Sequence, residues 1–279
     1  MDLSTPVVMG IVNATPDSFF SPSRVRTEHE VCAKVDQMVD EGAAIIDVGA
    51  FSTRPGAAEV SAEEEMSRLR VALTAIRHTH PDIVLSVDTF RPDVARMAVE
   101  EFGVAIINDV SEGGITGVTG IPRPERRGDV PEMFAMVAHL HAAYVLMSVK
   151  PSIDSMLKSF SEEVAMLRGL GVADIIIDPG FGFGKDLADN YRVMAHLDRL
   201  SILGLPILVG VSRKSMLTRL LDCDASSALN ATTALHTAAL LHGASILRVH
   251  DVREAVEACR VVEALRKAGA DHPGVTPQA

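Results

Sequence analysis

Short apolar runs recur eight times along the chain, and segments with helical periodicity separate them. Runs this short and this rich in β-branched residues are typical of parallel strands that helices bury on both faces. The predicted strands are Val7–Val12, Ala44–Val48, Ile83–Val87, Ala105–Ile107, Ala143–Met147, Ile175–Ile177, Ile207–Val211 and Ile246–Val249. Three helices are expected to begin after Thr27, after Ser61 and at Pro92, and five more cover roughly 130–141, 153–169, 187–200, 225–242 and 252–268.

Capping residues indicate where the first three helices begin. Thr27 with Glu30, and Ser61 with Glu64, have the spacing of a capping box, in which the first side chain accepts a hydrogen bond from the third residue of the helix. Pro92 stands at the expected start of the third helix, where its missing N–H leaves no hydrogen bond unmade.

The alternation of eight strands with eight helices favours a (β/α)8 TIM barrel. The alternative is an open, doubly wound parallel sheet, but no predicted strand is followed by the GxGxxG turn that many such sheets carry. We expect a single domain over residues 1–279, with its core over about 7–268 and a frayed tail at 271–279. The one long connection, about 112–131, is rich in Gly and Pro and is interpreted as a surface insertion rather than a binding loop.

Composition and charge exclude several classes of protein. Hydrophobic residues make up 47% of the chain and charged residues 23%, as in globular domains. We expect neither a secretion signal nor a membrane span, since no apolar stretch approaches the ~20 residues that a span needs. Three distant cysteines suit a reduced, cytoplasmic location better than a disulfide framework. The net charge of −11 argues against nucleic-acid or membrane-surface binding, so an anionic substrate would require local positive charge.

In a barrel of this kind the active site lies at the carboxyl ends of the strands, and charged or amide side chains stand at seven of the eight predicted ends. One set, which can read the donor and acceptor edge of a flat heterocycle, consists of Asp88, Asn108, Asp178 and Lys214. A second set, on the first and last strands, is a candidate anion site in which an amide oxygen can also bind Mg²⁺; it consists of Asn13, Arg248 and His250. The positive charge that an anionic substrate needs is available from Arg54, Arg213, Lys214, Arg248 and His250.

A glycine-rich segment, Asp178-Pro-Gly-Phe-Gly-Phe-Gly-Lys185, follows the sixth predicted strand. It is not a Walker phosphate loop, because Asp186 stands where Ser or Thr is required. The glycines are interpreted as allowing close packing under an aromatic ligand, and the phenylalanines could cover a flat molecule.

These strand ends resemble the dihydropteroate synthase family of folate biosynthesis, over about residues 7–268. The resemblance rests on seven motifs in order: Asn-Ala-Thr-Pro-Asp-Ser-Phe (13–19), Ser-Thr-Arg-Pro-Gly (52–56), Ser-Val-Asp-Thr (86–89), Ile-Asn-Asp-Val (107–110), Asp-Pro-Gly-Phe-Gly-Phe-Gly-Lys (178–185), Ser-Arg-Lys-Ser (212–215) and Arg-Val-His-Asp (248–251). It implies a transferase that condenses 6-hydroxymethyl-7,8-dihydropterin pyrophosphate with p-aminobenzoate, giving 7,8-dihydropteroate and pyrophosphate. It also implies a homodimer.

The resemblance assigns roles to residues by position. The pterin would contact Asp88, Asn108, Met147, Asp178, Lys214 and Arg248. The pyrophosphate would contact Asn13, Arg248 and His250, with Mg²⁺ bound through Asn13. The p-aminobenzoate site would consist of Phe19, Thr53, Arg54, Pro55, Phe183, Lys214 and Ser215. The residues implied to take part in catalysis are Lys214, Arg248 and His250.

The chain departs from the common family pattern in two places. Phe20–Arg24 replaces the usual Asp-Gly-Gly after Phe19, and Ser148 stands where a His commonly follows the Met of the fifth strand. Two other functions stay open: a methyltransferase of the same pterin-binding barrel superfamily, and a pterin-binding paralogue without catalysis. The methyltransferase has no evident use for the motifs at 52–56 and 212–215.

Overall fold

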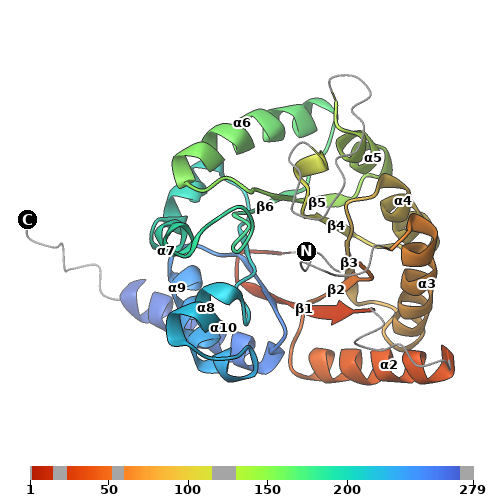
Figure 1. The fold of residues 1–279 in the computed structure, drawn as a ribbon, viewed down its shortest axis with the longest axis horizontal. Coiled ribbons are helices and arrows are strands. Elements are labelled where there is room, and N and C mark those ends of the chain that lie inside the picture. Colours follow the sequence, from red (N-terminus) through yellow and green to blue (C-terminus); the bar gives the residue numbers. More distant parts are fainter. Residues whose placement is uncertain (1, 15–23, 52–59, 115–129, 271–279) are drawn as a thin grey trace, which may run out of the picture.

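Parallel strands form a barrel that a ring of helices surrounds (Figure 1). The computed structural model describes residues 2–14, 24–51, 60–114 and 130–270, and in residues 24–27 and 270 the backbone only. The strands are β1 (Val7–Asn13), β2 (Ile45–Gly49), β3 (Val84–Asp88), β4 (Ile106–Asp109), β5 (Ala143–Met147), β6 (Ile175–Asp178), β7 (Leu208–Val209) and β8 (Ile246–Val249).

The order of the strands confirms the predicted barrel. Hydrogen-bonded neighbours follow the order β6-β5-β4-β3-β2-β1-β8-β7, with every pair parallel. The two ends of this series meet, because Ile177 of β6 forms a bridge with Ile207, and its N–H donates to Pro206 O over 2.9 Å. The sheet therefore closes almost completely, which an open doubly wound sheet does not do.

The helices follow the predicted alternation with some differences in their ends. They are α2 (Arg24–Asp40), α3 (Ala62–Thr79), α4 (Pro92–Phe102), α5 (Glu132–Leu140), α6 (Ile153–Gly169), α7 (Leu187–Ala195), α8 (Ser215–Leu221), α9 (Leu229–Leu241) and α10 (Val252–Ala270), with short 3-10 helices η1 (Glu112–Gly114), η2 (Leu197–Leu203) and η3 (Ser226–Ala228). The predicted segment at 187–200 is divided between α7 and η2, and the one at 225–242 between η3 and α9. The periodicity did not predict α8, because seven residues are too few to show a helical repeat.

Two of the three predicted helix starts are confirmed. Ser61 is the N-cap of α3 and accepts a hydrogen bond from Glu64 N over 3.2 Å, and Pro92 is the first residue of α4. The third is wrong, since α2 begins at Arg24, three residues before Thr27. A capping-box spacing inside a helix is uninformative, because Thr and Glu also occur in helix interiors.

The barrel interior explains why polar residues gather at the strand ends. A compact apolar cluster fills the barrel interior near the amino ends of the strands. Its buried members, all from strands, are Met9, Ile45, Ile106, Val145, Ile176, Leu208 and Ile246. Side chains alternate between the two faces of a strand, so residues two positions further along also point inward. On five of these strands the next inward positions are Asp47, Asn108, Met147, Asp178 and Arg248. The apolar floor therefore carries a largely polar layer directly above it.

The larger apolar core lies between the strands and the helices. Within the described residues, no helix is both long and apolar enough to cross a membrane. The predicted tail at 271–279 and most of the 112–131 connection lie outside the described residues.

A buried histidine in α9 makes the stability of the barrel depend on pH. His236 is 1% exposed, neither ring nitrogen has a hydrogen-bond partner within the described residues, and burial lowers its pKa to about 4 while Asp251 opposes the shift. The unfolded chain, with a histidine pKa near 6.5, thus binds the proton first as the pH falls, so folding loses stability below about pH 6.5.

Replacing His236 by leucine should flatten this dependence. We expect the free energy of unfolding of the original chain to fall between pH 7 and pH 5 by about 2 kcal/mol more than that of His236→Leu. Urea unfolding at the two pH values measures this difference. The control is His78→Leu, which replaces an exposed histidine. An equal pH dependence in the original chain and in His236→Leu would contradict the expectation.

Candidate active site

Arg248 occupies the centre of the polar layer, between two carboxylates from neighbouring strands. Its Nε donates to Asp47 Oδ2 and its Nη2 donates to Asp88 Oδ2, each over 2.7 Å. The Asp47 side chain is fully buried, whereas the Asp88 side chain keeps 25% exposure. Burial alone would lower the pKa of Arg248, but the charges of the two carboxylates outweigh it and raise the pKa. Arg248 therefore remains a cation at the floor of the barrel mouth.

Asp47 is a site residue to which the sequence reasoning gave no role. Its Oδ2 also accepts a hydrogen bond from Asn108 Nδ2 over 3.1 Å, so one carboxylate orients both Arg248 and Asn108. Its Oδ1 and the hydroxyl of Ser86, which pairs with Asp47 in the β2–β3 register, have no partner within the described residues. The signal was available in the sequence, since Asp47 stands two positions after the inward-facing Ile45.

The pterin set predicted from the strand ends gathers around this centre. Asp88 and Asn108 are paired in the β3–β4 register, and Met147 and Asp178 are paired in the β5–β6 register. Burial raises the pKa of Asp88 to about 7, Arg248 opposes the shift, and Asp47 adds to it. A carboxyl group with this pKa can change its protonation when a ligand binds near neutral pH.

Lys214 and Asp178 form the opposite side of the site. Lys214 donates through Nζ to Phe181 O, and the same ammonium lies 4.8 Å from the centre of the Phe183 ring. Burial lowers the pKa of Lys214 to about 8, while the carboxylate of Asp178 opposes that shift. Burial raises the pKa of Asp178, whose Oδ1 accepts a hydrogen bond from Gly180 N over 2.7 Å. The cation, the carboxylate and the aromatic ring thus share one wall of the barrel mouth.

The glycine-rich segment after β6 is held by its own lysine rather than arranged for a phosphate. Lys185 Nζ donates to Ser148 O over 3.0 Å, to Gly180 O over 3.1 Å and to Phe183 O over 3.0 Å. Burial also lowers the pKa of Lys185 to about 8. Lys185 is therefore a structural cation that fixes the segment against the end of β5.

At two of the three glycines, the predicted close packing is made with the neighbouring backbone at the end of β5. Gly180 and Gly184 have left-handed φ angles of 66° and 62°, and a Cβ atom there would stand 2.2 Å from Ser148 O and 2.4 Å from Val149 O. They are required for close contact with the neighbouring backbone. Of the two phenylalanines, Phe181 is buried in the core, so only Phe183 can contribute a face to the site.

The predicted anion set lies on adjacent strands, as expected. β1 and β8 are hydrogen-bonded neighbours, Asn13 is the last residue of β1, and His250 directly follows β8. His250 Nδ1 lies 3.0 Å from Ser212 Oγ, which also accepts the N–H of His250 over 3.2 Å. Arg213 does not join this set, because it is engaged with Asp251 instead. The expectation that its charge is available to a substrate is therefore wrong.

The predicted p-aminobenzoate set is only partly described. Phe183 and Lys214 lie together at the mouth, and Ser215 is the exposed first residue of α8, for which Lys214 is the N-cap. The remaining members lie outside the described residues; they are Phe19, Thr53, Arg54 and Pro55.

The donor set is compatible with Mg²⁺ only if a substrate supplies most of the ligands. No group of three or more His, Cys, Asp or Glu residues in the described part of the chain could hold a metal ion. Asn13 offers an amide oxygen at the rim, and Mg²⁺ commonly combines one or two protein oxygens with substrate phosphates and water.

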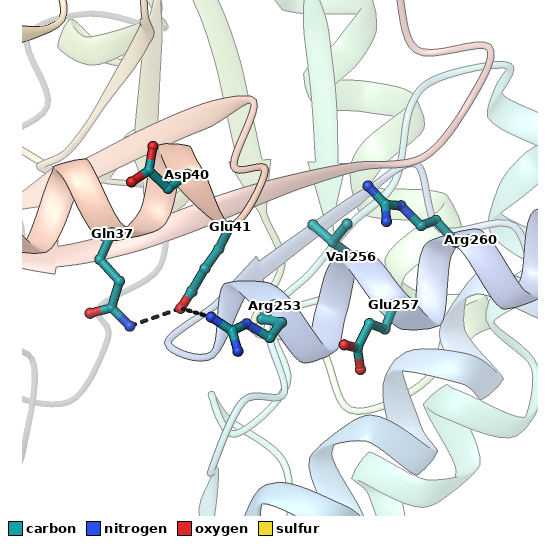
Figure 2. A pocket seen from close by; sticks show the side chains of 7 residues that line it. All are labelled: Gln37, Asp40, Glu41, Arg253, Val256, Glu257 and Arg260. Carbon is teal, nitrogen blue, oxygen red and sulfur yellow. Dashed lines mark hydrogen bonds and ion pairs between the residues drawn. The ribbon is translucent and has the colours of Figure 1, made fainter.

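A groove on the outer surface lies apart from this site. It runs between the end of α2 and α10, and Glu41 Oε1 within it accepts a hydrogen bond from Gln37 Nε2 over 2.8 Å and pairs with Arg253 Nη2 at 3.7 Å (Figure 2). None of its lining residues stands at the carboxyl end of a strand. The strand ends are therefore the better candidate for chemistry.

Comparisons with known proteins agree with the geometry. Residues 9–250 match the model of a family described as pterin binding enzyme. The Escherichia coli K12 dihydropteroate synthase is 40% identical, over 96% of this chain and 94% of that protein. A solved dihydropteroate synthase of Xanthomonas albilineans, with 4-aminobenzoic acid, is 35% identical with a TM-score of 0.83, covering 95% of each chain. A Clostridium difficile dihydropteroate synthase, solved in the presence of pteroic acid, is 33% identical with a TM-score of 0.83, covering 94% of this chain and 97% of the other.

The family assignment rests on agreement between these comparisons and the site. The matched region begins in β1 and ends at His250, so it contains every strand end described above. The chain belongs to the pterin-binding enzyme family, among the dihydropteroate synthases.

Proposed function

We propose that this chain is a dihydropteroate synthase that joins 6-hydroxymethyl-7,8-dihydropterin pyrophosphate to p-aminobenzoate and releases pyrophosphate. The observation that carries the proposal is the layer of Asp88, Asn108, Asp178 and Lys214 around Arg248. A layer of acceptors and donors at the floor of a barrel mouth suits a flat, amino-substituted heterocycle. The relatives solved with pteroic acid and with 4-aminobenzoic acid support the same pair of substrates.

The pterin would lie between the carboxylates and the cations of this layer. Asp178 is buried, and its Oδ1 already accepts Gly180 N, so its other oxygen is suited to accept from the amino-pyrimidine edge. Asn108 has its amide nitrogen directed to Asp47, which leaves its carbonyl oxygen as an acceptor. Met147 is 1% exposed and packs with Val110 and Phe183 beside the layer, which supplies apolar contact for the ring.

The leaving group would depart toward the rim between β8 and β1. Breaking the carbon–oxygen bond places negative charge on pyrophosphate, and Arg248 and His250 can stabilise that charge. Mg²⁺, held by Asn13 and phosphate oxygens, would supply further charge neutralisation. Arg248 is held in place by Asp47 and Asp88 before any ligand binds, so little reorganisation accompanies the reaction.

The nucleophile is the aromatic amine of p-aminobenzoate. Such an amine is unprotonated at neutral pH, so no general base is assigned to it. Phe183 and Lys214 would form the wall between the two substrates, and Ser215 at the start of α8 would meet the carboxylate. The protein then contributes orientation and exclusion of water rather than a strong base.

Pyrophosphate release on mixing both substrates with Mg²⁺ tests the proposal. We expect release that depends on p-aminobenzoate and that a chelator abolishes. Pterin binding without p-aminobenzoate-dependent turnover would favour a non-catalytic paralogue and contradict the synthase. Methyl transfer to or from a bound pterin would favour the methyltransferase of the same superfamily. We further propose a cytoplasmic homodimer, for which sedimentation equilibrium should give twice the chain mass.

Replacing Asp178 by asparagine should weaken pterin binding itself. The amide keeps the shape of the carboxylate but not its charge, and hydrogen bonds to charged groups contribute about 1.5–3 kcal/mol. We therefore expect the dissociation constant of 6-hydroxymethylpterin, measured by calorimetry, to rise at least tenfold. Asp154→Asn, which alters an exposed carboxylate of α6, is the control. Unchanged affinity in Asp178→Asn would remove Asp178 from the pterin site.

A further inference from the structure

Side-chain pairs continue the alignment of β7 with β8 beyond the point where backbone pairing ends. The backbone pairs stop at Val209 and Leu247, which are 38 positions apart in the chain. Further along, Ser212 contacts His250 and Arg213 contacts Asp251, again at a separation of 38 positions. The two loops that leave these strands are thus joined in the same parallel register, but through side chains.

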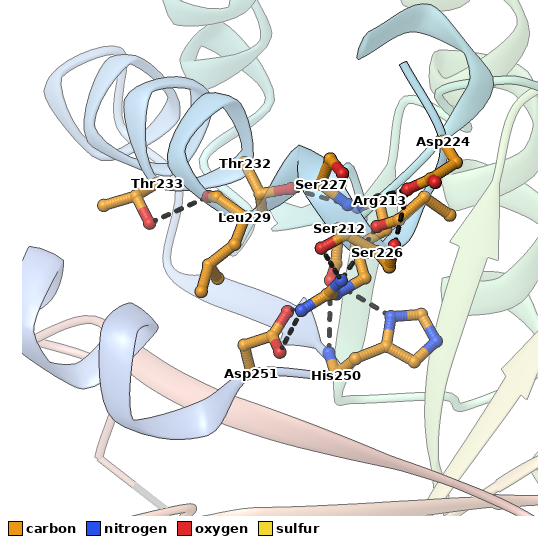
Figure 3. Close-up of polar contacts among 11 residues, drawn as sticks. Ser212, Arg213, Asp224, Ser226, Ser227, Leu229, Thr232, Thr233, His250 and Asp251 are labelled. Carbon is orange, nitrogen blue, oxygen red and sulfur yellow. Dashed lines mark hydrogen bonds and ion pairs between the residues drawn. The ribbon is translucent and has the colours of Figure 1, made fainter. Parts of the chain in front are cut away.

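The Arg213–Asp251 pair has the geometry of a specific clamp. Arg213 Nε and Nη2 donate to the two oxygens of Asp251, each over 2.8 Å (Figure 3). Arg213 Nη1 donates to Ala225 O over 2.8 Å and to Ser226 O over 2.9 Å. The two side chains are only 24% and 19% exposed, and a bidentate guanidinium–carboxylate pair fixes both distance and orientation.

The backbone around Arg213 is fixed as well. Its φ angle is 54°, in the left-handed region, which is unfavourable for a residue with a Cβ atom. Its N–H donates to Thr232 Oγ1 of α9 over 3.1 Å. The clamp and this bond hold Arg213 in a conformation that directs the next residue, Lys214, back toward the barrel axis, where its ammonium meets Phe181 O.

We propose that the Arg213–Asp251 pair is a positioning device that keeps Lys214 and His250 in one site. Each clamp residue is the chain neighbour of one of them, and the two clamp side chains point toward each other (Figure 3). The pair thereby couples the wall that separates the substrates to the rim that holds the pyrophosphate. This inference rests on the proposed function for the identity of the ligands.

Two conservative variants test the pair through anion binding. Arg213→Lys keeps the charge but cannot form the bidentate contact, and Asp251→Asn removes one negative charge beside the site. If net charge alone mattered, Arg213→Lys would leave anion binding unchanged and Asp251→Asn would tighten it. The clamp instead predicts weaker anion binding in both variants. We expect the dissociation constant of inorganic pyrophosphate, measured by calorimetry with Mg²⁺, to rise on the order of tenfold in each variant.

The matched controls are Arg199→Lys and Asp154→Asn, which alter an exposed arginine–aspartate pair between η2 and α6 and should leave pyrophosphate binding unchanged. Thermal unfolding of each variant identifies the temperature range in which all are folded, and binding is measured there. Wild-type pyrophosphate affinity in both clamp variants would overturn the proposal.

Turnover separates this proposal from the proposed function. With a functioning synthase, both clamp variants should show a raised KM for the pterin pyrophosphate and a lowered kcat. No p-aminobenzoate-dependent turnover in the original chain, together with weaker pyrophosphate binding in both variants, would refute the synthase but support the clamp. Normal turnover in the original chain and in both variants would refute the clamp alone.

Discussion

Replacing Arg248 by methionine is expected to lower turnover severely and to destabilise the fold. Arg248 is the cation that meets both Asp47 and Asp88, and the Asp47 carboxylate is fully buried. Removing one partner of a buried ion pair leaves an uncompensated charge, which costs about 3–5 kcal/mol. Loss of one charge-stabilising donor from an active site lowers kcat by about 10²–10³. Urea unfolding and pyrophosphate release measure the two effects.

The destabilisation should carry a pH signature. Burial raises the pKa of Asp88 to about 7 while Arg248 opposes the shift, so without Arg248 the folded state would take up this proton at a still higher pH, well above that of the unfolded chain. A group whose pKa is higher in the folded than in the unfolded chain stabilises the folded state at low pH. The folded state loses this stability as the pH rises. The stability deficit of Arg248→Met should therefore be larger at pH 8 than at pH 5.

An exposed arginine provides the control for Arg248. Arg70 Nε and Nη2 donate to the two carboxylate oxygens of Glu101 over 2.8 and 2.7 Å, but both side chains are nearly half exposed. Exposed pairs contribute about 0–1 kcal/mol, so Arg70→Met should change stability little. Adding Asp47→Asn to Arg248→Met should recover part of the lost stability, since it removes the stranded charge. Equal losses in Arg248→Met and Arg70→Met would contradict the buried-pair interpretation.

The sequence predicted the fold and the positions of the polar strand ends because both follow from periodicity. Alternation within a strand places Asn108, Asp178 and Arg248 above an apolar floor, and parallel strands bring those ends to one rim. Periodicity does not show which of these side chains pair with each other. Arg248 and Asp47 are 201 positions apart, and the sequence alone could not show which inward carboxylates the guanidinium would select.

Local backbone geometry accounts for the other misses. Arg213 was interpreted as a charge for the substrate, but its left-handed φ angle and its bond to Thr232 turn its side chain toward Asp251. Thr27 has the spacing of a capping box, yet α2 begins one turn earlier. Neither outcome is encoded in a periodic pattern, and the pairing of Arg213 depends on contacts between separate elements.

Replacing Gly180 by alanine is expected to destabilise the barrel strongly and to weaken pterin binding. The added Cβ atom would stand 2.2 Å from Ser148 O and 3.0 Å from Met147 Cγ, so either the segment after β6 or the end of β5 must move. Gly180 N is also the donor to Asp178 Oδ1, so movement of this residue displaces the carboxylate that we propose binds the pterin. The effect should therefore reach both stability and the site.

Gly204→Ala separates the two contributions to this loss. Gly204 has φ 63°, against 66° for Gly180, but no atom lies within 4 Å of its added Cβ in the described part of the chain. A left-handed alanine costs about 1–2 kcal/mol, which is the loss expected for Gly204→Ala. For Gly180→Ala the steric conflict adds to that figure, and we expect a total of at least about 4 kcal/mol, the range of exceptional single substitutions. Urea unfolding should rank the two variants in this order, with pterin affinity reduced only in Gly180→Ala. Equal losses of stability in the two variants would mean that the close approach to Ser148 O contributes nothing. Glycine would then be required at position 180 only for its left-handed φ angle.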